Sequence, residues 1–285
     1  WIMKLRGQTP EGIAEQRIVS GKSWEEFCDT LKAAGGAMVF PGAPRDAFNQ
    51  AEGYRYLSRL ARAGLEAFIE HADPRAPVLQ RVVHETAKMG SDNPDNYYQN
   101  AAISGEYEYR ISGYRGTVHY LGFGTQKGNY GQGGGMPPTG YVEASELEIG
   151  EDGYFELFIS SQEKPGNWLP MERESGTLIV RQTFMDRETE TIAQLKVERL
   201  NENGDPVFEP AAVTPESIDA GLNTASNLVA GASILFAKWA RDFQKHVNEL
   251  PQFDPEVSNA AGGDPNIIYY HSYWRLAPDE ALVIE

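Results

Sequence analysis

Cysteine is almost absent from this chain of 285 residues, which contains the single thiol of Cys28. One thiol cannot form an internal disulfide, and it cannot supply a multi-cysteine zinc or iron–sulfur site. Cys28 falls on the apolar stripe of a predicted helix, where we expect a buried and unreactive side chain. This scarcity excludes internal disulfides and cysteine-based metal chemistry.

Positive charge and long apolar runs are also scarce. The chain has 25 Lys and Arg residues against 41 Asp and Glu residues, and its net charge of −16 repels nucleic acids and anionic lipids. No apolar run approaches the roughly 18–20 residues that cross a bilayer, and the first residues are too polar for a secretory signal. We therefore expect a cytoplasmic protein with a small-molecule partner and neither a nucleic-acid nor a membrane partner. Self-association into a homo-oligomer stays open.

Several catalytic and cofactor motifs are missing. No two of the five histidines stand four residues apart, and no His-x-His pair occurs. There is no Gly-x-Ser-x-Gly nucleophile elbow and no glycine-rich phosphate-binding loop. We expect neither a metal nor a cofactor. A metal held by scattered groups such as His84, Glu85, Asp92 and Asp95 is the less favoured alternative, because these residues suit ordinary turns.

Residues 1–75 form a predicted helical region. Ser23 and Glu26 have the spacing of a capping box, which predicts a helix over residues 24–34. Gly35 and Gly36 are expected to end it in a left-handed conformation. A second amphipathic helix is predicted over residues 46–71, and its apolar stripe requires a partner surface.

Residues 76–212 form a predicted antiparallel β-sandwich, because short strands alternate with glycine-bearing turns. The predicted strands span residues 78–83, 101–103, 106–112, 116–123, 146–149, 154–160, 176–184 and 191–200. No β–α–β alternation accompanies them, which argues against a parallel nucleotide-binding sheet. The stretch 124–140 has no periodicity and five glycines between positions 128 and 135. It predicts either a flexible lid over the mouth of the sandwich or a disordered loop.

A long helix is predicted over residues 213–250. Thr214, Pro215 and Glu216 supply the N-cap, a first-turn proline and an early acidic residue. We expect a kink near Gly231, because about 35 residues is long for one helix. Residues 251–285 form an aromatic tail with a predicted strand at 281–285. That strand stops without a turn or cap, so we expect the native chain to continue beyond it.

Several motifs resemble an uncharacterised bacterial family, the proteins that carry the domain of unknown function numbered 1214. The sharpest is Asn167-Trp168-Leu169-Pro170, and further similarity lies at residues 92–98, 109–116, 177–182, 264–266 and 270–274. The resemblance covers residues 51–285 and implies a jelly-roll-like β-sandwich with appended helices. It also implies a second β-rich segment after residue 285, but no established chemistry. The predicted fold class is therefore α+β, with an antiparallel, jelly-roll-like sandwich between a helical N-terminal region and a long helix.

Trp168 and Arg181 are the sharpest candidates for a site. Trp168 lies on a turn and is interpreted either as a stacking surface for a flat ligand or as a plug at the end of the sandwich. Arg181 lies among apolar strand residues. If its side chain points inward, it needs a carboxylate of the protein or an anion of a ligand, because an unpaired buried charge is too costly.

Histidine, tyrosine and arginine residues of the predicted sheet form the wider candidate set. The predicted catalytic residues are His119, His271, Arg181 and Tyr98, and the predicted ligand-binding residues are Trp168, Tyr120, Tyr270, Trp274, Arg110 and Arg115. Such groups could stabilise an oxyanion and move a proton. A tyrosine-rich solvated sheet with cross-strand pairs is the alternative explanation.

Two functions follow from these candidates. The first is an enzyme that uses acid–base and electrostatic catalysis on a small neutral or ring-containing molecule, such as a sugar, a steroid or another lipid-like compound. The second is a non-catalytic ligand-binding or assembly module with a tryptophan and tyrosine surface. The enzyme predicts a deep pocket that combines His119 or His271 with arginine and tyrosine, and the module predicts a shallow aromatic surface.

Overall fold

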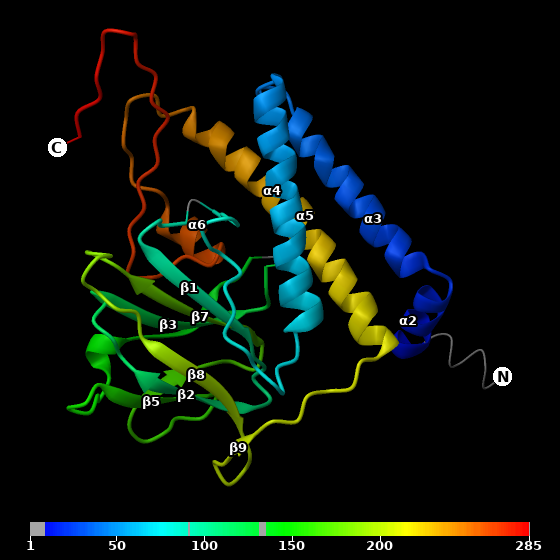
Figure 1. The fold of residues 1–285 in the computed structure, drawn as a ribbon, viewed down its shortest axis with the longest axis vertical. Coiled ribbons are helices and arrows are strands. Elements are labelled where there is room, and N and C mark those ends of the chain that lie inside the picture. Colours follow the sequence, from blue (N-terminus) through cyan, green and yellow to red (C-terminus); the bar gives the residue numbers. More distant parts are fainter. Residues whose placement is uncertain (1–8, 91, 131–134, 285) are drawn as a thin grey trace.

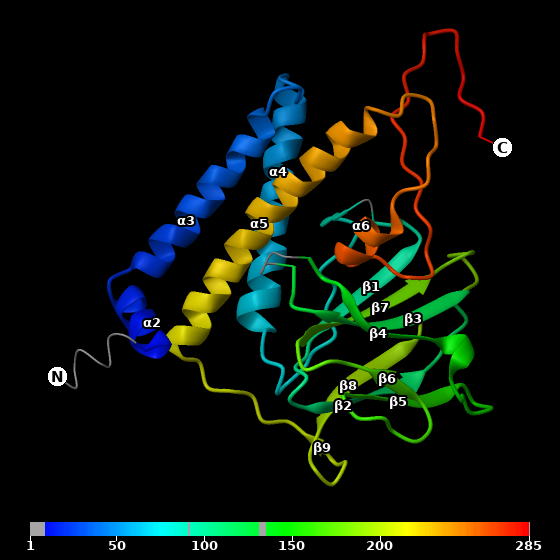
Figure 2. The ribbon, with the colours of Figure 1, turned by 180° about the vertical axis from the view of Figure 1, so that it is seen from behind.

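The protein has an α+β fold in which a helical layer covers one side of a two-sheet sandwich (Figures 1 and 2). A computed structural model describes residues 9–90, 92–130 and 135–284. The helices come before and after the strands in the chain and pack together beside the sandwich. This arrangement confirms the predicted fold class.

The helices vary widely in length. The long ones are α3 (Lys22–Ala34), α4 (Ala47–Leu65) and α5 (Pro215–Phe243), and the short ones are α2 (Pro10–Val19) and α6 (Pro255–Ala260). Single turns of other helical types extend or connect the regular elements: η1 (Gly35–Val39), η2 (Glu66–Glu70) and η3 (Ala144–Glu146). The helices predicted over residues 24–34 and 46–71 are therefore present, and the second ends in the π-helical turn η2.

The predicted cap of α3 is wrong. Gly21 is the N-cap and makes no side-chain cap bond. Ser23 lies inside the helix, where its hydroxyl donates to Asp219 of α5 at 2.5 Å. A tertiary partner thus takes the hydroxyl that the capping box would use. Gly35 is also right-handed, with φ of −57°, because the chain continues directly into η1.

Helix α5 is the centre of the helical layer. Thr214 and Ser217 form its capping box, and the helix runs without interruption through Gly231, where a kink was expected. It packs against α2, α3 and α4, and Gly64 of α4 approaches Ala225 closely. In the described chain, α5 is also long and apolar enough to cross a membrane, a test that core helices of soluble proteins pass too. The expectation that no segment reaches this length and apolarity therefore overlooked α5.

Cys28 is exposed, which corrects the expectation of a buried thiol. Phe27 is buried instead, at 6% exposure, and packs in a cluster with Leu222 and Ala225 of α5. The helix therefore turns Phe27 toward α5 and the neighbouring Cys28 toward solvent, because successive helical residues point about 100° apart.

Nine strands form two sheets. The first sheet has the order β1-β7-β3-β4 and the second has the order β6-β5-β2-β8-β9. The first comprises β1 (Asn96–Ala102), β3 (Tyr120–Lys127), β4 (Pro138–Glu143) and β7 (Ser175–Thr183). The second comprises β2 (Glu108–Tyr114), β5 (Tyr154–Ser160), β6 (Trp168–Pro170), β8 (Gln194–Leu200) and β9 (Pro206–Val207). All pairs are antiparallel except β5 and β6.

The sandwich core lies between the two sheets. Alternate residues point inward, so Phe123 of β3 and Val180 of β7 meet Ile111 and Leu157 of the opposite sheet in one cluster. Phe123 packs edge-on against Phe155 at 5.9 Å. The other residues of β7 and β3 therefore point away from this core, and they form the outer face of the four-stranded sheet.

Some predicted strands are wrong. Residues 78–83 contribute only an isolated bridge between Gln80 and Asn100, residues 146–149 are not a strand, and residues 281–284 are irregular. The stretch 124–140 holds the end of β3 and the start of β4, although three of its glycines lie outside the described residues. Gly140 occupies β4 because the Pro170 carbonyl lies where a Cβ would be, which hides the strand pattern.

The outer face of the four-stranded sheet is the surface that positions a site. Helix α6 and the chain around it lie over β1, β7 and β3, and the C-terminal half of α5 passes alongside (Figure 2). The outer face of the five-stranded sheet lies on the opposite side of the sandwich.

Candidate functional site

A pocket of about 630 Å³ lies between the four-stranded sheet, α5 and the segment that contains α6. Its floor is formed by Tyr98 of β1 with Ile179 and Arg181 of β7. One wall is an α5 stripe that includes Leu228 and Trp239. Pockets of 300–1,000 Å³ with apolar walls and few polar groups are typical of small-molecule sites.

Strand register brings the floor residues together. Tyr98 is directly opposite Arg181 in the pairing of β1 with β7. Both side chains point outward, because Val180 and Ala101 belong to the sandwich core on the other face. The pleat of two paired strands therefore places a phenol beside a guanidinium at the base of the pocket.

Arg181 is held from the far side of the pocket by the C-terminal segment. The side chain is buried, with 5% of the residue exposed, and it donates to the carbonyl oxygen of Gly262 at 2.6 Å. Its Nη1 lies 3.5 Å from a carboxylate oxygen of Asp264. Asp264 also accepts a hydrogen bond from the Tyr120 hydroxyl at 2.8 Å. Buried charges need such partners to offset their lost hydration.

Two phenols lie in the electrostatic field of Arg181. Burial raises the pKa of Tyr98 to about 12 and also raises the pKa of Tyr130, while the Arg181 charge opposes both shifts. Tyr269 lines the same pocket and interacts with both tyrosines. The backbone N–H of Asn93 donates to the Tyr98 oxygen at 3.0 Å, which leaves the phenolic proton to donate. Tyr98 and Tyr130 therefore stay protonated at neutral pH, and each keeps a phenolic proton that can be donated to a ligand.

Aromatic side chains surround His271 at the outer end of the pocket. The imidazole stacks on Phe243 at 4.4 Å and meets Phe253 edge-on at 4.7 Å, and Trp239 contacts the same group. Its Nδ1 is buried without a hydrogen-bond partner in the described structure. Burial lowers the pKa of His271, so the imidazole is neutral at neutral pH and can accept a proton.

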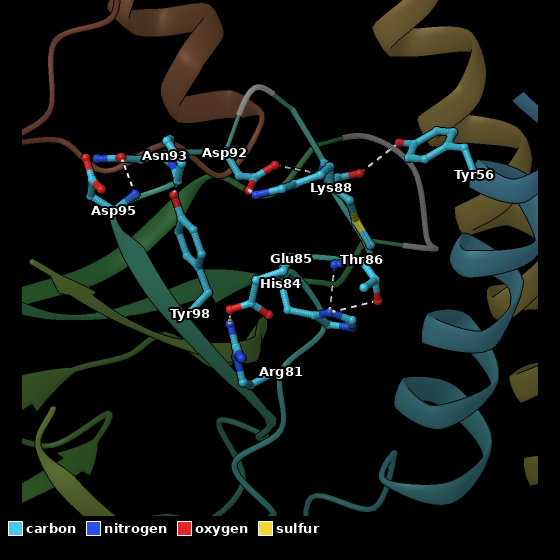
Figure 3. A network of polar contacts seen from close by, with 12 residues as sticks. Tyr56, Arg81, His84, Glu85, Thr86, Lys88, Asp92, Asn93, Asp95 and Tyr98 are labelled. Carbon is cyan, nitrogen blue, oxygen red and sulfur yellow. Dashed lines mark hydrogen bonds and ion pairs between the residues drawn. The ribbon is translucent and has the colours of Figure 1, made fainter. Parts of the chain in front are cut away.

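The chain before β1 forms the edge of the pocket, and Figure 3 shows its polar contacts. The Asp92 carboxylate accepts from the ammonium group of Lys88 at 3.0 Å and from the backbone N–H of Met89 at 3.1 Å. Tyr56 of α4 donates to the Lys88 carbonyl at 2.9 Å. These bonds fix the approach to β1 and hence the position of Tyr98.

The structure brings together three of the predicted catalytic residues. Tyr98, Arg181 and His271 all line the pocket. Tyr120 lies one step behind them, because its hydroxyl bonds to the Asp264 that pairs with Arg181. The predicted combination of His271 with arginine and tyrosine is therefore present in one pocket.

The fourth predicted catalytic residue and part of the binding set lie elsewhere. His119 is exposed in the loop before β3. Arg110 lies on the outer face of the five-stranded sheet, where it pairs with Glu156 at 3.2 Å and Glu198 at 3.3 Å. Arg115 donates to the backbone carbonyl of Val118 at 2.7 Å and thus braces a turn.

Three aromatic residues that were predicted to bind a ligand do not form one surface. The indole N–H of Trp168 donates to the Ser160 carbonyl at 3.1 Å, and the Asn167 amide donates to two carbonyls of neighbouring loops and strands, so this turn is tied to the sandwich. Tyr270 and Trp274 are 52% and 65% exposed on the C-terminal segment. These three rings are absent from the pocket lining.

Sequence reasoning missed several pocket residues. Trp239 carried a usable signal, since it lies on the apolar stripe of α5. Tyr130 stood next to the glycine cluster, and Asp264, which pairs with Arg181 without lining the pocket itself, stood in an ordinary Asp-Pro turn, so neither pattern indicated a position near Arg181. Within the described ranges, no group of three or more His, Cys, Asp or Glu side chains is placed to hold a metal ion.

The fold and the pocket define a helix-covered β-sandwich protein with a cavity of ligand size. The chain belongs to the same family as an uncharacterized protein from Burkholderia cenocepacia. The sequence of that protein is 48% identical to this chain, and its crystal structure matches with a TM-score of 0.87. The match covers 93% of this chain and 72% of the other. A protein from Vibrio parahaemolyticus shares 15% identity over 52% of this chain and 43% of its own, at a TM-score of 0.31.

No model of a known protein family matches the chain, and no curated protein matches it. The resemblance to proteins with the domain of unknown function numbered 1214 therefore stays a prediction.

Proposed function

We propose that the protein binds a small, ring-containing molecule in the pocket between the four-stranded sheet and α5. The observation that carries this proposal is the pocket itself, about 630 Å³ in volume, with mainly apolar walls and polar groups gathered at Arg181. Rings fit the aromatic groups around Trp239, and a polar substituent fits the donors of Arg181 and Tyr98. The net charge of −16 supports a small molecule over a nucleic acid as the partner.

A fluorescent probe tests this proposal. N-phenyl-1-naphthylamine is uncharged, contains only rings and an amine, and brightens in apolar surroundings. We expect saturable binding to the wild-type protein. We expect Gly231→Phe to abolish it, because Gly231 lines the pocket and an added Cβ there meets nothing within 4 Å.

Gly231→Ala is the matched control, since it changes the same position by a single methyl group and should retain the probe. Circular dichroism and thermal unfolding establish that each variant is folded. Equal probe binding by wild type and a folded Gly231→Phe variant would remove the pocket from the proposal.

We infer acid–base catalysis as a second candidate function. The specific observation is the buried Nδ1 of His271, which has no partner in the described structure and belongs to an imidazole with a lowered pKa. A neutral imidazole in a pocket with mainly apolar walls is suited to take a proton from a bound molecule. Arg181 and Tyr98 are placed on the floor to stabilise an oxyanion that forms.

Deuterium exchange tests this chemistry without knowledge of the natural substrate. The probe 1-tetralone is a neutral two-ring ketone, and its proton at C2 would pass to His271 before a deuteron from D₂O replaces it. We expect exchange above the buffer rate for wild type and for His119→Phe, and the buffer rate for His271→Phe. Exchange that is equal in both variants would exclude His271 as the base.

A further inference from the structure

The charges around the pocket are already balanced by the protein. Arg181 is paired with Asp264, and Asp92 is paired with Lys88 at 3.0 Å. Among the residues that the structure describes, Arg181 and Asp92 are the charged side chains of the pocket lining, apart from His271. His271 is neutral because burial lowers its pKa. A bound ligand therefore meets no uncompensated charge.

The Asp264 carboxylate is buried behind the pocket lining, 3.5 Å from Nη1 of Arg181, and compensates the charge of that guanidinium. The residue is 1% exposed. Its oxygens accept from the Tyr120 hydroxyl at 2.8 Å and from the backbone N–H of Asn266 at 2.9 Å, and they lie beside Arg181. Hydrogen bonds from several directions hold the geometry of this carboxylate.

We propose that this pocket selects neutral ring molecules with a hydrogen-bonding oxygen over the corresponding carboxylates, and that Asp264 sets this selectivity. The inference rests on the proposed binding function and names its ligand class. Asp264 is a positioning residue, since it acts through Arg181.

The physical basis is the cost of an extra buried charge. A ligand carboxylate would lose its hydration and lie close to Asp264, so the Arg181 charge would be shared between two anions. A carbonyl or hydroxyl oxygen pays a far smaller desolvation cost and can accept hydrogen bonds. Tyr98 has a phenolic proton to donate, and the guanidinium of Arg181 has five N–H donors, more than its contacts with Gly262 and Asp264 use.

Competition among three probes tests the selectivity of the wild-type protein. Methyl 2-naphthoate, 2-naphthamide and 2-naphthoate share one ring system and differ in the charge of one substituent. Each competes with N-phenyl-1-naphthylamine at pH 7.5. We expect 2-naphthoate to compete at least about tenfold more weakly than the ester and the amide, which corresponds to about 1.4 kcal/mol.

Asp264→Asn tests the assigned cause. It keeps the size of the side chain and removes the charge, so Arg181 becomes available for bidentate contact with a ligand carboxylate. We expect the preference for the ester over 2-naphthoate to fall about tenfold or to reverse. Asp279→Asn removes one charge from an exposed position of the same C-terminal segment and should keep the wild-type preference.

The outcomes separate this inference from the proposed function. Absence of N-phenyl-1-naphthylamine binding to wild type would contradict the proposed function. Binding of that probe together with equal competition by 2-naphthoate and its ester would overturn the selectivity alone. Discrimination that persists in a folded Asp264→Asn variant would overturn the role of Asp264. If that variant does not fold, the wild-type competition still decides the selectivity, and Tyr120→Phe, which removes one hydrogen bond to Asp264, should shift the preference in the same direction.

Discussion

At Arg181 the sequence predicts that the side chain needs a charged partner, but it does not identify that partner. Its place among apolar strand residues predicted that the guanidinium would need a carboxylate of the protein or a ligand anion. The carboxylate belongs to Asp264, 83 residues later in the chain. Sequence spacing carries no information about a partner at that separation, because it depends on how the C-terminal segment crosses the sheet. The same holds for Tyr120, whose hydroxyl donates to this Asp264 carboxylate.

His271 leads to a prediction about pH and stability. Its pKa is lowered in the folded protein, so the unfolded chain binds a proton more readily. The contribution of the neutral His271 to the free energy of unfolding is therefore fully present above the ordinary histidine pKa of about 6.5, and it decreases as the pH falls below that value. His84 contributes in the same direction, because burial and two nearby arginines lower its pKa. We expect the melting temperature of wild type to fall between pH 7.5 and pH 5.5.

His271→Phe should make this decrease smaller, since phenylalanine preserves the ring contacts with Phe243 and carries no proton to bind. His119→Phe provides the matched control at an exposed position and should keep the wild-type decrease. Thermal unfolding in buffers of constant ionic strength measures both. Identical pH dependence in wild type and His271→Phe would contradict the assigned environment of this imidazole.

At the scale of elements, close packing distinguishes two glycines of α5. An added Cβ at Gly221 would lie 2.4 Å from the carbonyl oxygen of Phe68, so the helix passes against η2 with no room for a methyl group. An added Cβ at Gly231 would meet nothing within 4 Å. The close backbone contact therefore requires glycine at position 221, whereas no contact requires it at position 231.

We predict opposite effects on stability for the two alanine variants. Gly221→Ala should destabilise the protein by about 1–3 kcal/mol, because backbone must move to accept the methyl group. Gly231→Ala should stabilise it by about 0.5–1 kcal/mol through the higher helix propensity of alanine. Urea unfolding measures both changes. Destabilisation by Gly231→Ala would show a packing constraint that the structure lacks.

Local patterns predicted the elements better than their ends. The alternation of side chains over residues 154–160 correctly predicted β5, and the capping residues around Thr214 correctly predicted the start of α5. The pattern failed where a tertiary partner replaced a local one, as Asp219 does for the hydroxyl of Ser23. It also failed at residues 78–83, where an apolar run packs beneath the helices and forms only a single bridge.

At the scale of the whole molecule, the pocket is assembled from distant parts of the chain. The loop before β1, the paired strands β1 and β7, the described residues around Tyr130 and Met136, helix α5 and the segment around α6 all contribute to its lining. The sequence named Tyr98, Arg181 and His271 as chemically capable residues, but it could not group them. The grouping follows from the topology, which lays α5 and the C-terminal segment on one sheet (Figure 2).

Ligand binding should stabilise the whole fold for the same reason. A molecule that binds only the folded state at 100 times its Kd contributes about 2.7 kcal/mol, which raises the melting temperature by several degrees in a protein of this size. We expect this rise for methyl 2-naphthoate with wild type and no rise with Gly231→Phe, measured by differential scanning fluorimetry. A similar rise in both proteins would place the ligand outside the pocket.

The central claim is that the space between Arg181, Tyr98 and Trp239 is a binding site for a ring-containing molecule. A crystal structure of the protein grown with methyl 2-naphthoate tests it most directly. The account predicts the naphthalene rings beside Trp239 and the ester oxygen within hydrogen-bonding distance of Arg181 or Tyr98. An empty pocket at saturating ligand, or density for the probe only on another surface, would contradict it.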